Sequence, residues 1–219
     1  WAFEHDRTRM TLNWEHESIR VESPLLGEFN IANVLAAATA VIAAGYSLAE
    51  VSKHIGSLES VPGRMETFQV PNGPLVIVDY AHTPDALQQV LKAARNHCFG
   101  SLWCVFGCGG DRDRGKRPQM GQVAAKYADV SVVTDDNPRT EEPLQIIDDI
   151  ITGMPHGTNY QRYPGRVEAI RHAVTAAGPN DVIVCAGKGH ETYQIIGTRS
   201  QDYDERAYVA LLAEELRHD

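Results

Sequence analysis

From residue 74 onward, short uninterrupted apolar runs alternate with amphipathic helical stretches. Continuous apolar runs are typical of parallel strands buried on both faces, and strands that alternate with helices favour a mostly parallel sheet covered by helices on both sides. We therefore expect an α/β fold of Rossmann-like type. The expected strands lie at 74–81, 101–107, 130–134 and 181–187, the expected helices at 83–98, 118–128, 143–154, 165–177 and 204–217, and a hairpin at 193–201.

The segment before this alternation follows a different pattern. Residues 1–23 alternate polar and apolar side chains, which predicts half-buried antiparallel strands. An Ala-rich helix is expected at 30–46, and a second helix after Ser47, which suits an N-cap. The Pro/Gly break ESVPGRME then predicts a domain boundary, which divides the chain into residues 1–62 and 63–219.

Composition and charge exclude several classes of protein. The formal net charge of −9 lacks the basic excess of a nucleic-acid surface. No apolar stretch reaches the roughly 18 residues of a membrane span, and no signal peptide is recognisable. The first residues begin in mid-pattern, so we expect the chain to be part of a longer protein. The cysteines have no zinc-site spacing, which favours reduced thiols in a cytoplasmic protein: Cys98, Cys104, Cys108 and Cys185.

Polar residues follow four of the expected strands. Ligands of parallel sheets bind outside the carboxyl ends of the strands. The topology therefore predicts that these clusters meet along one edge of the sheet, and this convergence is more informative than any one cluster. The clusters are Asp79–His82, Gly107–Arg114, Asp135–Arg139 and Gly187–Glu191.

The glycine-rich cluster has two interpretations. Gly110–Lys116 fits the spacing GxxxxGK of a phosphate-binding loop, but Arg117 stands where a magnesium-binding Ser or Thr is needed. A tight strand-to-helix turn explains the glycines better. It does not explain Arg112 and Arg114, which either are solvated or bind an anion through their guanidinium groups.

Two other clusters are individually ambiguous. The amides of GKGHE suit a carboxylate or phosphate, although a plain turn fits equally well, and Glu191 could accept from an ammonium group. Asp79 could bond a ribose hydroxyl or, with Thr83, cap the next helix. His82 lacks an evident orienting partner, and we expect no metal site.

The stretch VTDDNPRTEEP places one cation in an acidic loop. Asp136 and Asn137 would accept hydrogen bonds while Arg139 takes a carboxylate, and Pro138 limits the backbone between them. We expect Glu141–Glu142 to form the acidic first turn of the following helix. A ligand with both an ammonium and a carboxylate group, such as the end of a free amino acid, would satisfy both kinds of side chain.

Together these motifs resemble the carboxyl-terminal domain of the Mur ligases, and the resemblance extends over essentially the whole chain. Upstream, GEFNIANVLAA and PGRME resemble the end of that family's central ATPase domain and its junction to the third domain, so residues 1–62 would be a remnant of the central domain. The motifs that carry the resemblance, in order, are YAHTPDAL, GCGGDRDRGKRP, TDDNPRTEEP and GKGHE.

The resemblance implies an activity and its substrates. It is greatest to the members that add meso-2,6-diaminopimelate to UDP-MurNAc-L-Ala-D-Glu in cytoplasmic peptidoglycan precursor synthesis. In these ligases ATP phosphorylates the glutamate carboxylate, the amine attacks the acyl phosphate, and Mg²⁺ spreads the phosphate charge. The family's phosphate loop, carbamylated lysine and most magnesium ligands would precede residue 1, so we expect the chain to be inactive alone and its catalytic residues to lie elsewhere.

The resemblance also assigns residues to two ligands. Asn30 or Asn33 would lie at the adenine, Arg64 at the phosphates and Asp79 at the ribose, and His82 belongs to the same motif. The resulting ATP-binding set is Asn30, Asn33, Arg64, Asp79 and His82. Arg112 would join Arg139 at the distal carboxylate, and the diaminopimelate-binding set is Arg112, Asp136, Asn137, Pro138, Arg139, Gly187 and Glu191.

Three alternatives remain. The chain could be a non-catalytic module that binds an amino acid or nucleotide, or part of a related ligase that uses L-lysine. Lysine has no distal carboxylate, so a pair of arginines would have nothing to bind. A dinucleotide oxidoreductase is disfavoured because GCGGDRD lacks the third glycine of GxGxxG. We expect a monomer that contacts neither nucleic acid nor membrane.

Overall fold

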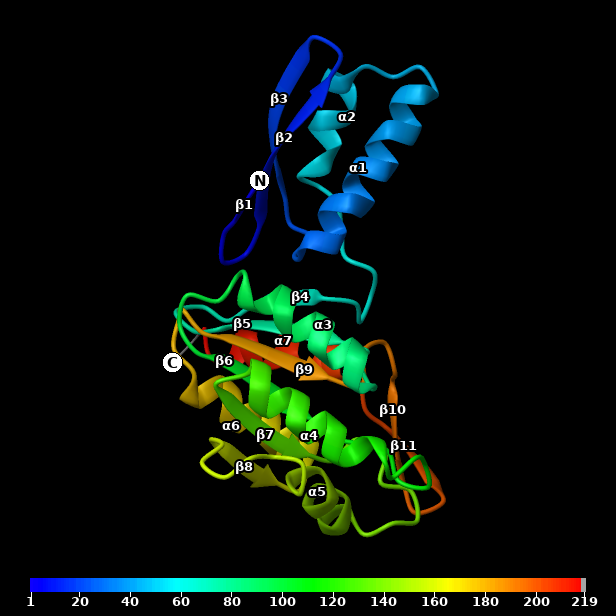
Figure 1. Cartoon of the computed structure of the whole chain (residues 1–219), viewed down its shortest axis with the longest axis vertical. Helices are drawn as coiled ribbons and strands as arrows, with labels where there is room; N and C mark the ends of the chain where they lie inside the picture. Colours follow the sequence, from blue (N-terminus) through cyan, green and yellow to red (C-terminus); the bar gives the residue numbers. More distant parts are fainter. Residues whose placement is uncertain (218–219) are drawn as a thin grey trace.

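The computed structural model describes residues 1–217, which form a smaller and a larger body joined by a short connection (Figure 1). The smaller body packs two helices against an antiparallel sheet of order β1-β2-β3. Its apolar cluster includes Met10, Val34 and Ile55. Its elements are β1 Ala2–Phe3, β2 Thr8–Trp14, β3 Glu17–Ser23, α1 Glu28–Ala43 and α2 Leu48–Ile55.

A six-stranded sheet forms the centre of the larger body. Its order is β4-β5-β9-β6-β7-β8, and every neighbouring pair is parallel except β4 with β5. This confirms the expected mostly parallel α/β sheet. The strands are β4 Glu66–Gln69, β5 Leu75–Asp79, β6 Leu102–Phe106, β7 Val130–Thr134, β8 Tyr160–Tyr163 and β9 Val182–Ala186.

Helices cover both faces of this sheet (Figure 1). Along β5, Ile77 packs into the cluster on one face and Val76 into the cluster on the other, as the alternation of a strand requires. Helices α3 Pro84–Arg95, α4 Lys116–Tyr127 and α5 Pro143–Ile151 pack on the first face. Helices α6 Arg166–Ala176 and α7 Glu205–Glu215 pack on the second, and the hairpin β10 Tyr193–Ile196 and β11 Arg199–Asp202 lies beside the sheet.

Most local predictions are confirmed. Ser47 forms a capping box with Glu50, and Thr83 caps α3 with Pro84 in the first turn. Two edge strands, β4 and β8, were not expected, because neither has a continuous apolar run. The expectation for Glu141–Glu142 was wrong: α5 begins at Pro143 and has no acidic residue in its first turn.

One imidazole joins the two bodies. His97, fully buried just beyond α3, accepts a hydrogen bond from the Gly27 amide through Nε2 and therefore donates to the Glu4 carbonyl through Nδ1. Leu26 is buried among the apolar side chains of the larger body. The domain boundary near residue 62 stays a prediction. Within residues 1–217, no helix is long and apolar enough to cross a membrane.

Candidate functional site

The four polar clusters follow four strands that are neighbours in the sheet. β5, β9, β6 and β7 lie side by side and run parallel, so their carboxyl ends share one edge. We call this edge the rim. Because β9 lies between β5 and β6, the Gly187–Glu191 loop takes a central place between Asp79–His82 and Gly107–Arg114.

The loop after β7 meets the loop after β9 through a buried lysine. The Lys188 ammonium donates to Asn137 Oδ1 at 2.6 Å, to Glu191 Oε2 at 3.2 Å and to the Tyr193 carbonyl at 2.9 Å. Asp136 Oδ1 lies 3.5 Å from the same nitrogen. Asn137 Nδ2 in turn donates to Glu191 at 3.2 Å. These contacts place Asp136, Asn137 and Glu191 in one group, as the sequence predicted.

Lys188 is fully buried, and this sets the electrostatics of the group. Burial lowers the pKa of its ammonium, while the Asp136 and Glu191 carboxylates favour the charged form. Two carboxylates face one internal cation, so the group retains a net negative charge. It can attract one further ammonium group.

Arg139 has an unusual backbone and a partly free side chain. Its φ is 51°, in the left-handed region that non-glycine residues seldom adopt. Hydrogen bonds hold it there: its amide donates to the Ile195 carbonyl at 3.1 Å, and its carbonyl accepts from Gly197 at 2.7 Å. The Nη1 atom donates to the Gly110 carbonyl at 2.9 Å. Within the described chain, Nε and Nη2 have no protein partner, which leaves one side of the guanidinium for an anion.

The loop after β6 packs tightly against the same segment. A Cβ added to Gly110 would lie 1.9 Å from the Pro138 carbonyl oxygen, so only glycine fits there. The Gly110 amide donates to the Asn137 carbonyl, and the Asp111 amide donates to Glu141. Because protein groups take these amides, the structure supports a tight turn and not a phosphate-binding loop.

The arginines of this region have different surroundings. Arg112 is exposed and donates to the Asp111 carbonyl, whereas Arg114 pairs with Glu141 at 2.9 Å. Arg117 was noted in the sequence only because it stands where a phosphate-binding loop needs Ser or Thr. In the structure its side chain is fully buried between Glu141 and Asp149. Its guanidinium lowers the pKa of Glu141 to about 2. Glu141 therefore links two loops.

A sequence profile of the Mur ligase, glutamate ligase domain matches residues 63–189. The chain belongs to the Mur ligase family. A Mur ligase of Alkalilimnicola ehrlichii, named UDP-N-acetylmuramoyl-L-alanyl-D-glutamate–2,6-diaminopimelate ligase, is 54% identical over 208 residues, which are 94% of this chain and 42% of that protein.

Solved structures of Mur ligases agree with this assignment. A solved structure of a ligase with the same name is 42% identical to this chain in sequence. The two structures match with a TM-score of 0.85, and the match covers 100% of this chain and 45% of that one. A UDP-N-acetylmuramate–alanine ligase from Thermotoga maritima shares the fold, with a TM-score of 0.65 at 18% identity over 99% of this chain and 44% of that one. The chain thus spans less than half the length of these relatives.

The residues assigned to ATP by resemblance to the Mur ligases lie in two places. Asp79, at the end of β5, accepts from the amides of Met65 and Ala81, at 2.9 and 2.8 Å. Burial raises the pKa of its carboxyl group. Asp79 therefore braces the β5 loop, and the cap of α3 comes from Thr83 alone. Arg64 is exposed and lies 4.7 Å above the Tyr80 ring.

Rings gather around Tyr80. His82 packs edge-on against it at 4.7 Å between ring centroids and bonds the Tyr80 carbonyl through Nδ1, and His190 lies 5.1 Å away. Arg64 and His82 are thus brought together at the β5 end of the rim. Asn30 and Asn33 are not: both lie on α1, where Asn33 Nδ2 donates to Asn30 Oδ1 and Asn30 donates to the Leu26 carbonyl.

The sequence did not identify several residues that shape the rim of this Mur ligase family domain. Lys188 was visible only as the residue between two glycines, and its burial depends on the β9 position. Arg166 and Glu205, a fully buried pair, gave no local signal because 38 intervening residues separate them in the chain. Tyr80 lies between Asp79 and His82 in the sequence. Both of these residues were predicted to belong to the site, so its ring could have been predicted as part of it.

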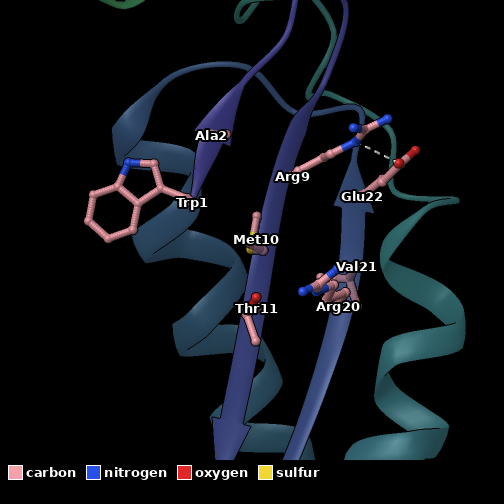
Figure 2. A pocket seen from close by; sticks show the side chains of 8 residues that line it. All are labelled: Trp1, Ala2, Arg9, Met10, Thr11, Arg20, Val21 and Glu22. Atoms are coloured by element: carbon pink, nitrogen blue, oxygen red, sulfur yellow. Dashed lines mark hydrogen bonds and ion pairs between the residues drawn. The ribbon is translucent and has the colours of Figure 1, made fainter.

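One open hollow lies in the smaller body, away from the rim. Figure 2 shows the residues that line this hollow, which lie on or beside β1, β2 and β3. Its volume is about 510 Å³. Arg9 and Glu22 pair across it at 2.9 Å, and Trp1 lies at its border. No predicted site residue lines it, so we place the functional site at the rim. Across residues 1–217, no three His, Cys, Asp or Glu side chains are grouped to hold a metal ion.

Proposed function

We propose that the protein containing this chain is an ATP-dependent amide ligase that adds meso-2,6-diaminopimelate to UDP-MurNAc-L-Ala-D-Glu in the cytoplasm, and that the rim binds the diaminopimelate. The observation that carries the proposal is the pairing of an acidic group with a free guanidinium on one edge of a Mur ligase domain. The 54% identical relative that bears this name supports it.

The two kinds of side chain suit the two kinds of ligand group. The ligand ammonium would be attracted by Asp136 and Glu191, whose charges Lys188 only partly offsets. Its carboxylate would pair with the free side of Arg139. Arg112 is exposed and could join it, because both arginine side chains lie beside Gly109: a Cβ added there would be 2.9 Å from Arg139 Nη1 and 3.6 Å from Arg112 Cγ. L-Lysine offers the ammonium but no distal carboxylate, so the Arg139 side chain favours diaminopimelate.

ATP fits the β5 end of the rim in part. The exposed Arg64 guanidinium is available to phosphate, and Asp79, though both its oxygens already accept amides, retains lone pairs for a hydroxyl. When bound, ATP would supply the phosphoryl group that activates the substrate carboxylate. Within residues 1–217, no three His, Cys, Asp or Glu side chains are grouped to hold magnesium.

Calorimetric titration of the 219-residue chain with meso-diaminopimelate and with L-lysine tests the proposal. We expect diaminopimelate to bind at least tenfold more tightly than lysine. The difference corresponds to about 1.5–3 kcal/mol for one charged hydrogen bond. Equal binding of both amino acids would leave the arginine without its proposed role, and binding of neither would remove the ligand assignment.

Substitution of Arg139 separates the two ligands. Arg139→Ala should weaken diaminopimelate binding by about tenfold to a hundredfold, because it removes a charged hydrogen-bond donor, and should leave ATP binding nearly unchanged. Arg20→Ala, at an exposed position on β3, is the matched control. Loss of both ligands to the same extent would show that Arg139 maintains the fold and does not bind the substrate.

A further inference from the structure

A fully buried ion pair lies beneath the rim. Arg166, the first residue of α6, donates to Glu205, the first residue of α7, through Nε and through Nη2, the latter at 3.0 Å. Both side chains are completely buried, which is costly for charged groups unless other hydrogen bonds satisfy them. The Tyr203 hydroxyl supplies one such bond to Glu205 at 3.0 Å.

The remaining hydrogen bonds of Arg166 lead to the rim. Nη2 donates to the Ala186 carbonyl at 2.9 Å, and Nη1 donates to the Asp135 carbonyl at 3.2 Å. Ala186 ends β9 and Asp135 follows β7, and these strands are not neighbours because β6 lies between them. One guanidinium therefore holds two strand ends that no shared backbone ladder connects.

The next residue along each strand belongs to the proposed ligand site. Asp136 follows Asp135, and Gly187 follows Ala186. Across the gap between these two loops, Asn137 contacts both Lys188 and Glu191 at hydrogen-bond distance. Hydrogen bonds of this kind are lost when their partners move apart by about 1 Å, so the distance between the strand ends decides whether the acidic group forms.

We propose that Arg166, held by Glu205, is a positioning residue that sets the distance between the Asp136–Arg139 loop and the Gly187–Glu191 loop. Its role in ligand binding rests on the proposed function. An ion pair that only stabilises the packing of α6 on α7 is the alternative. The positioning role and the purely stabilising role predict different results. Apolar side chains can replace a purely stabilising ion pair without loss of stability. They cannot donate the hydrogen bonds that hold the two carbonyl groups in place.

The test compares a single and a double variant of the 219-residue chain. Arg166→Met should lower the unfolding midpoint strongly, since it leaves the Glu205 charge buried and unpaired. The double variant Arg166→Met/Glu205→Leu should recover most of that midpoint. It should nevertheless bind meso-diaminopimelate at least about tenfold more weakly than the wild type, as expected for misplaced binding groups.

The same two helices provide a matched control. Arg171 of α6 pairs with Glu215 of α7 at 3.0 Å, but both side chains are about half exposed (49% and 46%). The variant Arg171→Met/Glu215→Leu should keep wild-type binding. If the buried double variant regains its stability and also binds like the wild type, Arg166 is only a stabilising residue and the proposal is refuted.

A second readout does not depend on the ligand. Nuclear magnetic resonance of the Asn137 side-chain amide reports its hydrogen bond to Glu191. The resonance should shift in the buried double variant and stay unchanged in the exposed control. An unchanged resonance in both overturns the positioning role, even if the wild-type chain binds no diaminopimelate. Absence of wild-type binding by itself refutes the proposed function.

Discussion

Arg117→Met tests the ion pairs that connect the loops of the rim to the helices behind them. The Arg117 guanidinium bonds Glu141 at 2.8 and 3.0 Å, Asp149 at 2.9 Å and the Gly109 carbonyl at 3.4 Å, and its side chain is fully buried. Removing one partner of a buried ion pair costs about 3–5 kcal/mol. Glu141 would keep Arg114 and the Asp111 amide, so we expect about 3 kcal/mol, the lower end.

Urea unfolding and thermal unfolding measure this loss. For a domain of this size, about 3 kcal/mol lowers the unfolding midpoint by about 6–12 °C. Arg162→Met is the control, because Arg162 pairs with Asp148 at the surface, where both side chains are about half exposed, and such a pair contributes about 0–1 kcal/mol. A loss below about 1 kcal/mol for Arg117→Met would show that solvent or neighbouring groups compensate, and the reasoning would be refuted.

Acid unfolding gives an independent check of the same contact. Arg117 lowers the pKa of Glu141 to about 2 in the folded chain, below the ordinary value of about 4.3. A depressed carboxyl pKa contributes stability above the unfolded value, and that stability is lost as the pH falls through the folded value. The wild type should therefore lose free energy of unfolding between about pH 4.5 and pH 2, and Arg117→Met should lose less over this interval.

Two further predictions concern the joint between the bodies and the tight turn at the rim. Burial lowers the pKa of His97, so the free energy of unfolding should fall as the pH drops below about 6.5. The variant His97→Gln can still accept the hydrogen bond from the Gly27 amide. Its free energy of unfolding in urea should therefore fall less between about pH 7 and 5.5. Gly110→Ala should cost about 1–3 kcal/mol, because its Cβ would overlap the Pro138 carbonyl. Gly178→Ala should change the unfolding midpoint little, because its Cβ would meet only Asp181 Oδ2, at 4.0 Å. A flat pH response in the wild type, or equal effects of the two alanines, would contradict these expectations.

The parallel strands and their helices could be predicted because each has a strong local pattern. The runs at β5, β6, β7 and β9 are continuously apolar, and Pro84 marks the start of a helix. The edge strand β8 could not be predicted, because its residues alternate in exposure and its pairing with β7 is not local.

The rim could be predicted as a place but not in its internal contacts. The rule that ligands bind at strand ends brought Asp136, Asn137 and Glu191 together, which the structure bears out. The pairing of Glu141 with Arg117 and of Lys188 with Asn137 joins residues far apart in the chain, which no periodicity encodes. The binding of ATP and diaminopimelate at these residues stays a prediction.

The position of β9 has a consequence for how the chain folds during synthesis. β9 is the last parallel strand to leave the ribosome, yet it is hydrogen-bonded between β5 and β6. Until residues 182–186 are made, β4–β5 and β6–β8 can form only two separate ribbons with open inner edges, which are prone to pair with other chains. We therefore expect the nascent chain to complete its rim late, when its final parallel strand joins the two ribbons.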